Sequence, residues 1–319
     1  MITVSHLTKR YGDKYALNDV NFDVKKGEIL GFLGPNGAGK STTMNIITGY
    51  ISYTEGEVKV DGYDIMDNPM EVKKRIGYLP EIPPLYLDMT VWDYLEFVFA
   101  LKNVKTTDMK EHLQSVIDTV KIDGVKNRKI SNLSKGYRQR VGFAGALIGD
   151  PDILILDEPT VGLDPKQIIE IRNAIKELGK KKTIIFSSHI LSEISSVCDR
   201  VIIINKGKIV AEDTPQNLSA KIGDAQRMMI RVSGDKEQAE SILESFDSVS
   251  NVTCVSSLGD TFDFEFDTKM SNEDKKELFF AFAQNSIPIL LQQETEVSLE
   301  EIFLKLTSAK EANYESDIQ

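Results

Sequence analysis

Residues 34–41 of the chain read Gly-Pro-Asn-Gly-Ala-Gly-Lys-Ser, and the run Ile-Leu-Gly-Phe-Leu at 29–33 leads directly into them. A helical stretch from Lys40 to Thr48 follows, so the segment is a strand, a glycine-rich loop and a helix. Glycines let the backbone curl so that successive N–H groups point at one phosphate, and the start of the following helix adds partial positive charge. The sequence therefore predicts a phosphate-binding loop here.

The residues and their offsets match the pattern of a P-loop, which binds a nucleoside triphosphate. We expect Lys40 to neutralise the β- and γ-phosphates and Ser41 to give its hydroxyl to Mg²⁺. A merely flexible glycine loop is the weaker alternative, because four residue types must coincide at fixed offsets. The predicted nucleotide-binding residues of this segment are Gly34, Pro35, Asn36, Gly37, Ala38, Gly39, Lys40, Ser41 and Thr42.

Two carboxylates follow another apolar run. Residues 153–156 read Ile-Leu-Ile-Leu and end in Asp157 and Glu158, at the carboxyl end of a strand, where open α/β sheets bind their ligands. Asp157 is placed to hold Mg²⁺, and Glu158 to orient or deprotonate the water that attacks the γ-phosphate. The alternative is that the two acids only cap the strand before Pro159. The presence of the phosphate loop makes this interpretation less favourable.

Length, charge and hydropathy limit the remaining possibilities. A chain of 319 residues exceeds the usual size of one domain, and residues 226–319 hold 19 acidic and 8 basic side chains, against 30 of each in residues 1–225. An acidic chain has the wrong sign for nucleic acid. No apolar run approaches the ~18 residues of a membrane-spanning helix, and no secretion signal is visible, so work at a membrane requires a partner.

The first 224 residues have the pattern of an α/β domain. Short apolar runs in residues 1–30 predict antiparallel strands at one edge, a further strand pair is expected at 56–60 and 75–79, and residues 90–145 have helical periodicity. The apolar face of that helical part is marked by Val91, Tyr94, Leu95, Val98 and Leu101. Strands return at 153–156, 183–186 and 201–204, each after a helix-like segment, which predicts a mainly parallel sheet.

The second domain is predicted from a different order of elements. Strands at 228–232, 249–255, 261–266 and 287–291 alternate with helices at 236–246 and 272–284. This is the split βαβ order of ferredoxin-like folds. A closing helix, Leu299–Leu306, and a polar tail at 310–319 follow. The predicted domains are therefore 1–224, 225–309 and the tail.

Residues 133–140, Leu-Ser-Lys-Gly-Tyr-Arg-Gln-Arg, resemble the signature sequence of ABC ATPases, and we call them the signature segment. Ser134 is placed to cap the next helix, so that its hydroxyl, the Gly136 N–H and the helix dipole form an anion site. In the family this site faces the γ-phosphate bound by the opposite subunit, which implies a homodimer closed by ATP. Lys135 and Tyr137 depart from the usual glycine and glutamine.

Weaker matches occur in the order that the family implies, and the resemblance covers roughly residues 1–220. Tyr11 resembles the aromatic that stacks on adenine, His189 the histidine that hydrogen-bonds the γ-phosphate, and Gly162-Leu163-Asp164 the loop that communicates across the dimer. Alone, each has a plainer interpretation: a turn aromatic, a residue at a helix start, or a helix cap before Pro165. Glu81 stands where most members have a glutamine that touches Mg²⁺, so it is a predicted metal ligand.

The resemblance also implies partners. The helical insertion, about 82–148, is the region that receives a coupling helix of the membrane permease in this family. Periodicity predicts that most of the aromatics at Tyr86, Trp92, Tyr94, Phe97 and Phe99 are core and that one or two at the surface serve docking. Residues 294–307 resemble the C-terminal end of ATPases that serve exporters, which favours export.

These observations predict an α/β P-loop NTPase fold of the ABC ATPase type, with an antiparallel edge sheet and a helical insertion, followed by a small α+β ferredoxin-like domain. The expected function is an ATPase with Mg²⁺ that drives a permease from the cytoplasmic face of the membrane. A soluble ABC ATPase of a nucleic-acid or ribosomal machine is the alternative, but one phosphate loop, one signature segment and no long coiled coil disfavour it. A regulatory subunit without turnover is disfavoured because Lys40, Asp157, Glu158 and His189 are all present.

Overall fold

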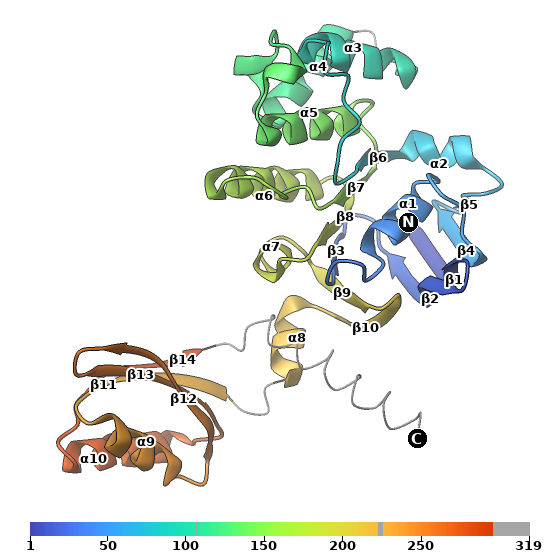
Figure 1. Ribbon diagram of the computed structural model, residues 1–319. Coiled ribbons are helices and arrows are strands. Elements are labelled where there is room, and N and C mark those ends of the chain that lie inside the picture. Colours follow the sequence, from blue (N-terminus) through green and yellow to red (C-terminus); the bar gives the residue numbers. More distant parts are fainter. Residues whose placement is uncertain (106–107, 223–225, 296–319) are drawn as a thin grey trace. The chain divides into compact units, whose positions relative to one another are not determined.

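The computed structural model describes residues 1–105, 108–222 and 226–295 (Figure 1). The chain forms two compact units, Met1–Pro215 and Gln216–Gln319. The predicted boundary between 224 and 225 and the tail at 310–319 fall on residues outside the described ranges, so that division stays a prediction.

The first unit begins with an antiparallel sheet in the strand order β2-β1-β4-β5. Its strands are β1 (Ile2–Tyr11), β2 (Lys14–Val24), β4 (Glu55–Val60) and β5 (Tyr63–Asp64). The register pairs Ile2 with both Val24 and Val60, so apolar side chains of three strands meet on one face. Period-two alternation predicts such a sheet, with one face in the core.

A six-stranded sheet in the order β10-β9-β3-β8-β7-β6 forms the centre of this unit. Its strands are β3 (Ile29–Leu33), β6 (Ile76–Leu79), β7 (Ile153–Asp157), β8 (Thr183–Ser188), β9 (Arg200–Asn205) and β10 (Lys208–Asp213). All neighbours are parallel except β9 and β10. Every residue of β3, β7 and β8 is buried, as expected for parallel strands covered on both faces. The mainly parallel sheet is confirmed.

Strands β4 and β6 are not the pair that the sequence predicts. β4 lies between β1 and β5 in the antiparallel sheet, whereas β6 pairs with β7 in the parallel sheet. Helix α2 (Pro69–Arg75) separates the two strands and leads the chain from one sheet to the other. Adjacency in sequence suggested a pairing that the crossover through α2 prevents.

Helix α1 (Lys40–Ile47) follows β3, and α6 (Pro165–Gly179) and α7 (Leu191–Ser195) follow β7 and β8. The core that surrounds α1 joins the two sheets. In it the rings of Phe22 and Phe32 lie 5.3 Å apart, and Met44, Ile46 and Ile47 of α1 are buried. This packing holds the start of α1 next to the carboxyl ends of β3, β7 and β8.

Helices α3 (Val91–Leu101), α4 (Met109–Thr119) and α5 (Lys135–Leu147) form the insertion, with short 3₁₀ turns at Asp123–Val125 and Ile130–Asn132. Figure 1 shows the three helices gathered in one group beyond β6. Thr90 and Ser134 cap α3 and α5, as N-cap hydroxyls commonly do. One assignment is wrong: Leu101 is 72% exposed, and Phe99 is buried in its place. Leu101 is the last residue of α3, where the helix periodicity no longer meets a neighbour.

Helix α8 (Pro215–Ile222) precedes the second sheet domain. Its elements are β11 (Gln226–Ser233), α9 (Lys236–Glu244), β12 (Val249–Leu258), β13 (Thr261–Thr268), α10 (Asn272–Gln284) and β14 (Ile289–Thr295). The antiparallel order β12-β13-β11-β14 places β13 between β11 and β12, which is the split βαβ of the ferredoxin-like prediction. Phe264, Phe266 and Phe282 fill the core between sheet and helices.

The predicted closing helix at 299–306 lies outside the described residues. Among residues 1–105, 108–222 and 226–295, no helix combines the length and apolarity needed to cross a membrane.

Candidate active site

The phosphate loop, residues 34–41, connects β3 to α1 in a conformation that requires glycine. Gly39 has φ of 114°, and a Cβ there would lie 2.7 Å from Leu17 Cδ2 and 2.9 Å from the Ala16 carbonyl oxygen. No side chain of the described residues caps α1 at Gly39. The first-turn N–H groups of α1 therefore have no partner within the helix and suit an anionic ligand.

A cavity of about 380 Å³ lies over this loop. It brings together residues of four predicted groups, namely Asn36, Gly37, Gly39, Lys40, Ser41 and Thr42 of the loop with Glu81, Glu158 and His189. Ala16 and Val161 complete the lining. Residues from distant parts of the sequence thus share one hollow, which has the volume of a small-molecule ligand site.

A buried ion pair joins the loop to the end of β7. Lys40 Nζ lies 3.2 Å from Glu158 Oε1, and both side chains are only 6% exposed. The same ammonium donates to the carbonyl oxygens of Gly34, at 2.7 Å, and Pro35, at 3.3 Å. Because these acceptors compensate its desolvation, Lys40 holds a positive charge at the floor of the cavity.

Glu158 is fixed in an unusual backbone conformation. Its φ of 48° lies in the left-handed region, and its N–H donates to the carbonyl and hydroxyl oxygens of Ser187. Its second carboxylate oxygen lies 2.8 Å from His189 Nδ1. Non-glycine residues in this region are strained, and such strain often occurs at functional sites. Glu158 therefore meets a cation on one side and an imidazole on the other.

Asp157, the last residue of β7, is buried and hydrogen-bonded. It accepts from the Ser187 hydroxyl at 2.5 Å and also shares a hydrogen bond with Ser41. Burial raises the pKa of Asp157, while the hydrogen bonds of Ser187 and Ser41 act in the opposite direction. The sequence did not single out Ser187, although a serine at the carboxyl end of a neighbouring parallel strand was a usable signal.

Ser41, Asp157 and Glu81 have the chemistry of a magnesium site. In the described part of the chain, no group of three His, Cys, Asp or Glu side chains is arranged to hold a metal by itself. Mg²⁺ differs from metals that need such a group, because it is bound through one or two carboxylates together with substrate phosphates and water. The hydroxyl of Ser41 beside the Asp157 carboxylate fits that pattern.

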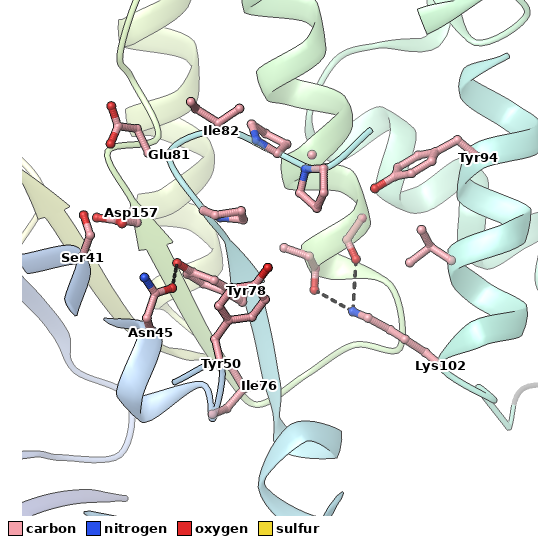
Figure 2. A pocket seen from close by; sticks show the side chains of 17 residues that line it. Ser41, Asn45, Tyr50, Ile76, Tyr78, Glu81, Ile82, Tyr94, Lys102 and Asp157 are labelled. Carbon is pink, nitrogen blue, oxygen red and sulfur yellow. Dashed lines mark hydrogen bonds between the residues drawn. The ribbon is translucent and has the colours of Figure 1, made fainter. Parts of the chain in front are cut away.

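A second cavity, of about 590 Å³, extends from Ser41, Asp157 and Glu81 to the helical insertion (Figure 2). Inside it the Tyr78 hydroxyl donates to Asn45 Oδ1 at 2.9 Å, and burial raises the pKa of Tyr78. At the other end Lys102 Nζ donates to backbone carbonyls of α5 and the residue after it, including Gly145 at 3.1 Å. Sequence motifs gave no signal for Asn45, Tyr78 or Lys102.

Six of the predicted nucleotide-binding residues lie outside the lining of these cavities, namely Tyr11, Gly34, Pro35, Ala38, Ser134 and Gly136. Ser134 accepts a hydrogen bond from the Tyr137 N–H at 3.4 Å, which makes it the N-cap of α5, and Gly136 is buried next to it. Tyr11 is 55% exposed, with Lys9 Nζ 5.0 Å from its ring centre. Asp164 caps α6 by accepting from the Gln167 N–H, as its plainer interpretation predicts.

The chain is similar in sequence to known proteins. Residues 17–161 match the family model described as ABC transporter. The chain is 32% identical over 310 residues to the linearmycin resistance ATP-binding protein LnrL of Bacillus subtilis (strain 168), covering 96% of this chain and 98% of that protein. It is 40% identical over 216 residues to the bacitracin transport ATP-binding protein BcrA of Bacillus licheniformis, covering 66% of this chain and 69% of that one.

A solved structure extends the likeness to three dimensions. The dimeric, post-hydrolysis structure of the ATP-binding cassette MJ0796 with ADP and Pi has a TM-score of 0.63 and 28% identity, and the match covers 67% of this chain and 98% of that one. The ATP-binding-subunit fold that the signature segment predicts is thereby confirmed.

Replacing Lys40 with alanine is expected to lower the rate of ATP hydrolysis by at least about a hundredfold, because the cavity loses its buried cation. Phosphate release in the presence of Mg²⁺ measures this rate, and circular dichroism checks that the variant is folded. Lys26→Ala, which removes an exposed lysine before β3, is the control and should match the parent. Turnover by Lys40→Ala at the parent rate would contradict the assignment.

Proposed function

Because this chain belongs to the family of ABC transporter ATP-binding subunits, which hydrolyse ATP, we propose that it powers a separate membrane permease, acting from the cytoplasmic face of the membrane as part of an exporter. The observation that carries the proposal is the buried ion pair of Lys40 and Glu158 at the phosphate loop, with the exposed His189 2.8 Å from the Glu158 carboxylate. A regulatory subunit without turnover does not need this group.

In this proposal the triphosphate lies along residues 34–42, with its phosphates at the start of α1. The phosphate oxygens compete with Glu158 for the Lys40 ammonium, which lies between the loop and that carboxylate. Nucleotide binding thus releases Glu158 from its ion pair. Tyr11 would stack on adenine, which places the base outside the phosphate cavity.

Ser41, Asp157 and Glu81 would hold Mg²⁺, which neutralises charge on the phosphates when bound. The Asp157 carboxylate is already oriented by Ser187, so its geometry is fixed before any ligand arrives. Glu81 lines both cavities and lies on the segment that follows β6. Glu81 is thus a candidate metal ligand that also lies next to the helical insertion.

Hydrolysis then depends on Glu158 and His189. The released Glu158 carboxylate accepts a proton from the attacking water, and His189, 2.8 Å from it, orients the carboxylate and hydrogen-bonds the γ-phosphate. The products are ADP and phosphate. Ser134 and Gly136 of a second copy would close the site over the γ-phosphate, so that ATP binding favours a dimer and hydrolysis reopens it.

Replacing Glu158 with glutamine tests this mechanism. The variant should bind ATP, hydrolyse it at least about a hundredfold more slowly, and accumulate as a dimer, because the amide cannot take the proton. Phosphate release and size-exclusion chromatography with ATP measure the two effects. Glu177→Gln, at an exposed position of α6, is the matched control and should stay monomeric after turnover. If Glu158→Gln hydrolyses ATP at the parent rate, Glu158 does not activate the attacking water. If the variant does not dimerise with ATP, the closed-dimer step is wrong.

Replacing Glu81 with glutamine tests its metal role separately. We expect the Mg²⁺ concentration for half-maximal ATP hydrolysis to rise by about threefold, because a charged ligand becomes neutral. A Mg²⁺ titration of the hydrolysis rate measures the shift. Asp88→Asn, an exposed acid in the same connecting segment, should leave the titration unchanged. An identical curve for Glu81→Gln and the parent means that Glu81 does not contact the metal.

The permease would dock on the insertion. Several apolar side chains of this region are exposed, namely Ile82, Tyr86, Leu87, Phe97 and Leu101, and Ile82 also lines the larger cavity. Tyr86 and Phe97 pack edge to face with ring centres 5.3 Å apart, so both rings form one surface. Apolar patches of this kind mark sites of protein contact. The same cavity reaches Glu81 and Asp157, which gives the permease a path to the metal ligands.

Export is favoured by the relatives, one named for linearmycin resistance and another for bacitracin transport. A nucleic-acid or ribosomal machine remains the second candidate, but the net charge of −11 opposes binding to a polyanion. We therefore expect a permease and a second copy of this chain as partners, and no nucleic acid.

Replacing Leu101 with glutamate should release the permease, because a charge is placed in the proposed contact. The measurement is recovery of a polytopic membrane protein with the tagged chain from detergent-solubilised membranes. Leu258→Glu, at an exposed leucine of β12, is the control and should recover the parent amount. Basal ATP hydrolysis should persist in both variants. Equal recovery with both variants excludes this docking surface, and capture of ribosomes instead supports the second candidate.

A further inference from the structure

Lys135 occupies a place where a lysine is locally unfavourable. It is the first residue of α5, directly after the N-cap Ser134, and positive charge near a helix N-terminus opposes the helix dipole. Within the described residues no carboxylate forms an ion pair with its ammonium. A residue that breaks a local rule without a local compensation usually has a role elsewhere.

The side chain of Lys135 lies across the backbone of Gly162, in the loop between Glu158 and α6. A Cβ on Gly162 would lie 2.7 Å from Lys135 Cε and 2.9 Å from Cδ, and it would also touch Nζ. Gly162 has φ of 74°, a conformation that side chains rarely adopt. Lys135 is an exposed residue, and the end of its side chain rests on the Gly162 backbone.

The contact is reciprocal. Gln167, in the first turn of α6, lies across Gly136 of the signature segment, where a Cβ would collide with its amide oxygen. Each of the two segments thus covers a glycine of the other with a long side chain. Further along, Arg140 Nη2 of α5 lies 2.6 Å from Glu170 Oε2 of α6. The start of α5 and residues 162–170 therefore pack closely against each other.

Gly162 lies in a loop that begins at Glu158 and contains two backbone turns. The N–H of Val161 donates to the carbonyl of Glu158 at 3.2 Å, and that of Leu163 to the carbonyl of Thr160 at 3.2 Å. Gly162 makes neither of these hydrogen bonds, so it is joined to Glu158 through the covalent backbone of the loop. Glu158 has a left-handed φ, a conformation that its surroundings must hold, and the 159–164 loop continues directly from it.

We propose that Lys135 is a positioning residue, which holds the 159–164 loop by packing on Gly162 and so keeps Glu158 in place for ATP hydrolysis. The proposal rests on the proposed role of Glu158 in activating the attacking water. It assigns a function to the lysine that replaces the usual glycine of the signature segment, and it places that function within one subunit. The long unbranched side chain of Lys135 performs this function through packing, and its charge is not needed.

Three variants separate packing from charge. Lys135→Gly should lower kcat for ATP by about three- to tenfold with KM for ATP within about twofold, because the loop is misplaced while the nucleotide contacts remain. Lys135→Met keeps an unbranched stem without charge and should restore kcat to within about twofold of the parent. Lys166→Gly, an exposed lysine in the first turn of α6, controls for glycine in a helix start and should match the parent. Equal losses for Lys135→Met and Lys135→Gly would overturn packing as the cause.

Hydrogen exchange gives a readout that does not depend on catalysis. Amides of residues 159–164 should exchange faster in Lys135→Gly than in Lys135→Met or the parent. Unchanged exchange in Lys135→Gly overturns the proposal even if kcat falls. Exchange of residues 159–164 can rise in Lys135→Gly while Glu158→Gln hydrolyses ATP at the parent rate. In that case Lys135 does hold the loop, but the proposed role of Glu158 is wrong. The two ideas are thus tested apart.

A double variant tests the contact itself. Gly162→Ala places a methyl group where the lysine lies, so it should displace Lys135 and reduce kcat on its own. Adding Lys135→Gly to Gly162→Ala should reduce kcat by less than about twofold more, because the contact is already lost. Fully multiplicative losses would show that the two residues act independently and would overturn the proposal.

Discussion

The buried ion pair of Lys40 and Glu158 is the interaction on which the rest of the site depends. It joins the start of α1 to the end of β7 across the floor of the cavity, with both side chains almost fully withdrawn from water. Such a pair is costly unless further hydrogen bonds satisfy it, and here the Gly34 carbonyl and His189 do so. In the proposed mechanism a phosphate competes for the same ammonium, which links ligand binding to the availability of Glu158.

Much of this arrangement follows from the sequence because it is encoded locally. Strands buried on both faces read as continuous apolar runs, as in β3 and β7, and the residues after them fall at one edge of the sheet. The glycines of the phosphate loop determine its conformation, as the positive φ of Gly39 shows. In the second unit, short strands and amphipathic helices in the order of a split βαβ leave few alternatives for the topology.

Prediction from the sequence fails where contacts between segments that are distant in the chain determine the structure. The placement of β4 and β6 in different sheets depends on the crossover through α2, and the exposure of Leu101 depends on what the end of α3 meets. Ser187 carries no motif, yet it binds both the Glu158 N–H and the Asp157 carboxylate, because β7 and β8 are neighbours. The cavity from Asp157 to Lys102 likewise belongs to no single segment.

Two local rules are broken close to the contact between α5 and residues 162–170. Glu158 adopts a left-handed φ, and Lys135 puts a cation at a helix start. Each is unfavourable alone, so each must be held by its surroundings. Ser187 holds the backbone of Glu158, the Gly162 backbone seats the lysine, and in our proposal the latter contact also steadies the loop after Glu158. Since Ser134 and Gly136 belong to the proposed contact with a second copy, this packing joins the surface proposed to meet the neighbour's nucleotide to the loop that follows the proposed water-activating carboxylate.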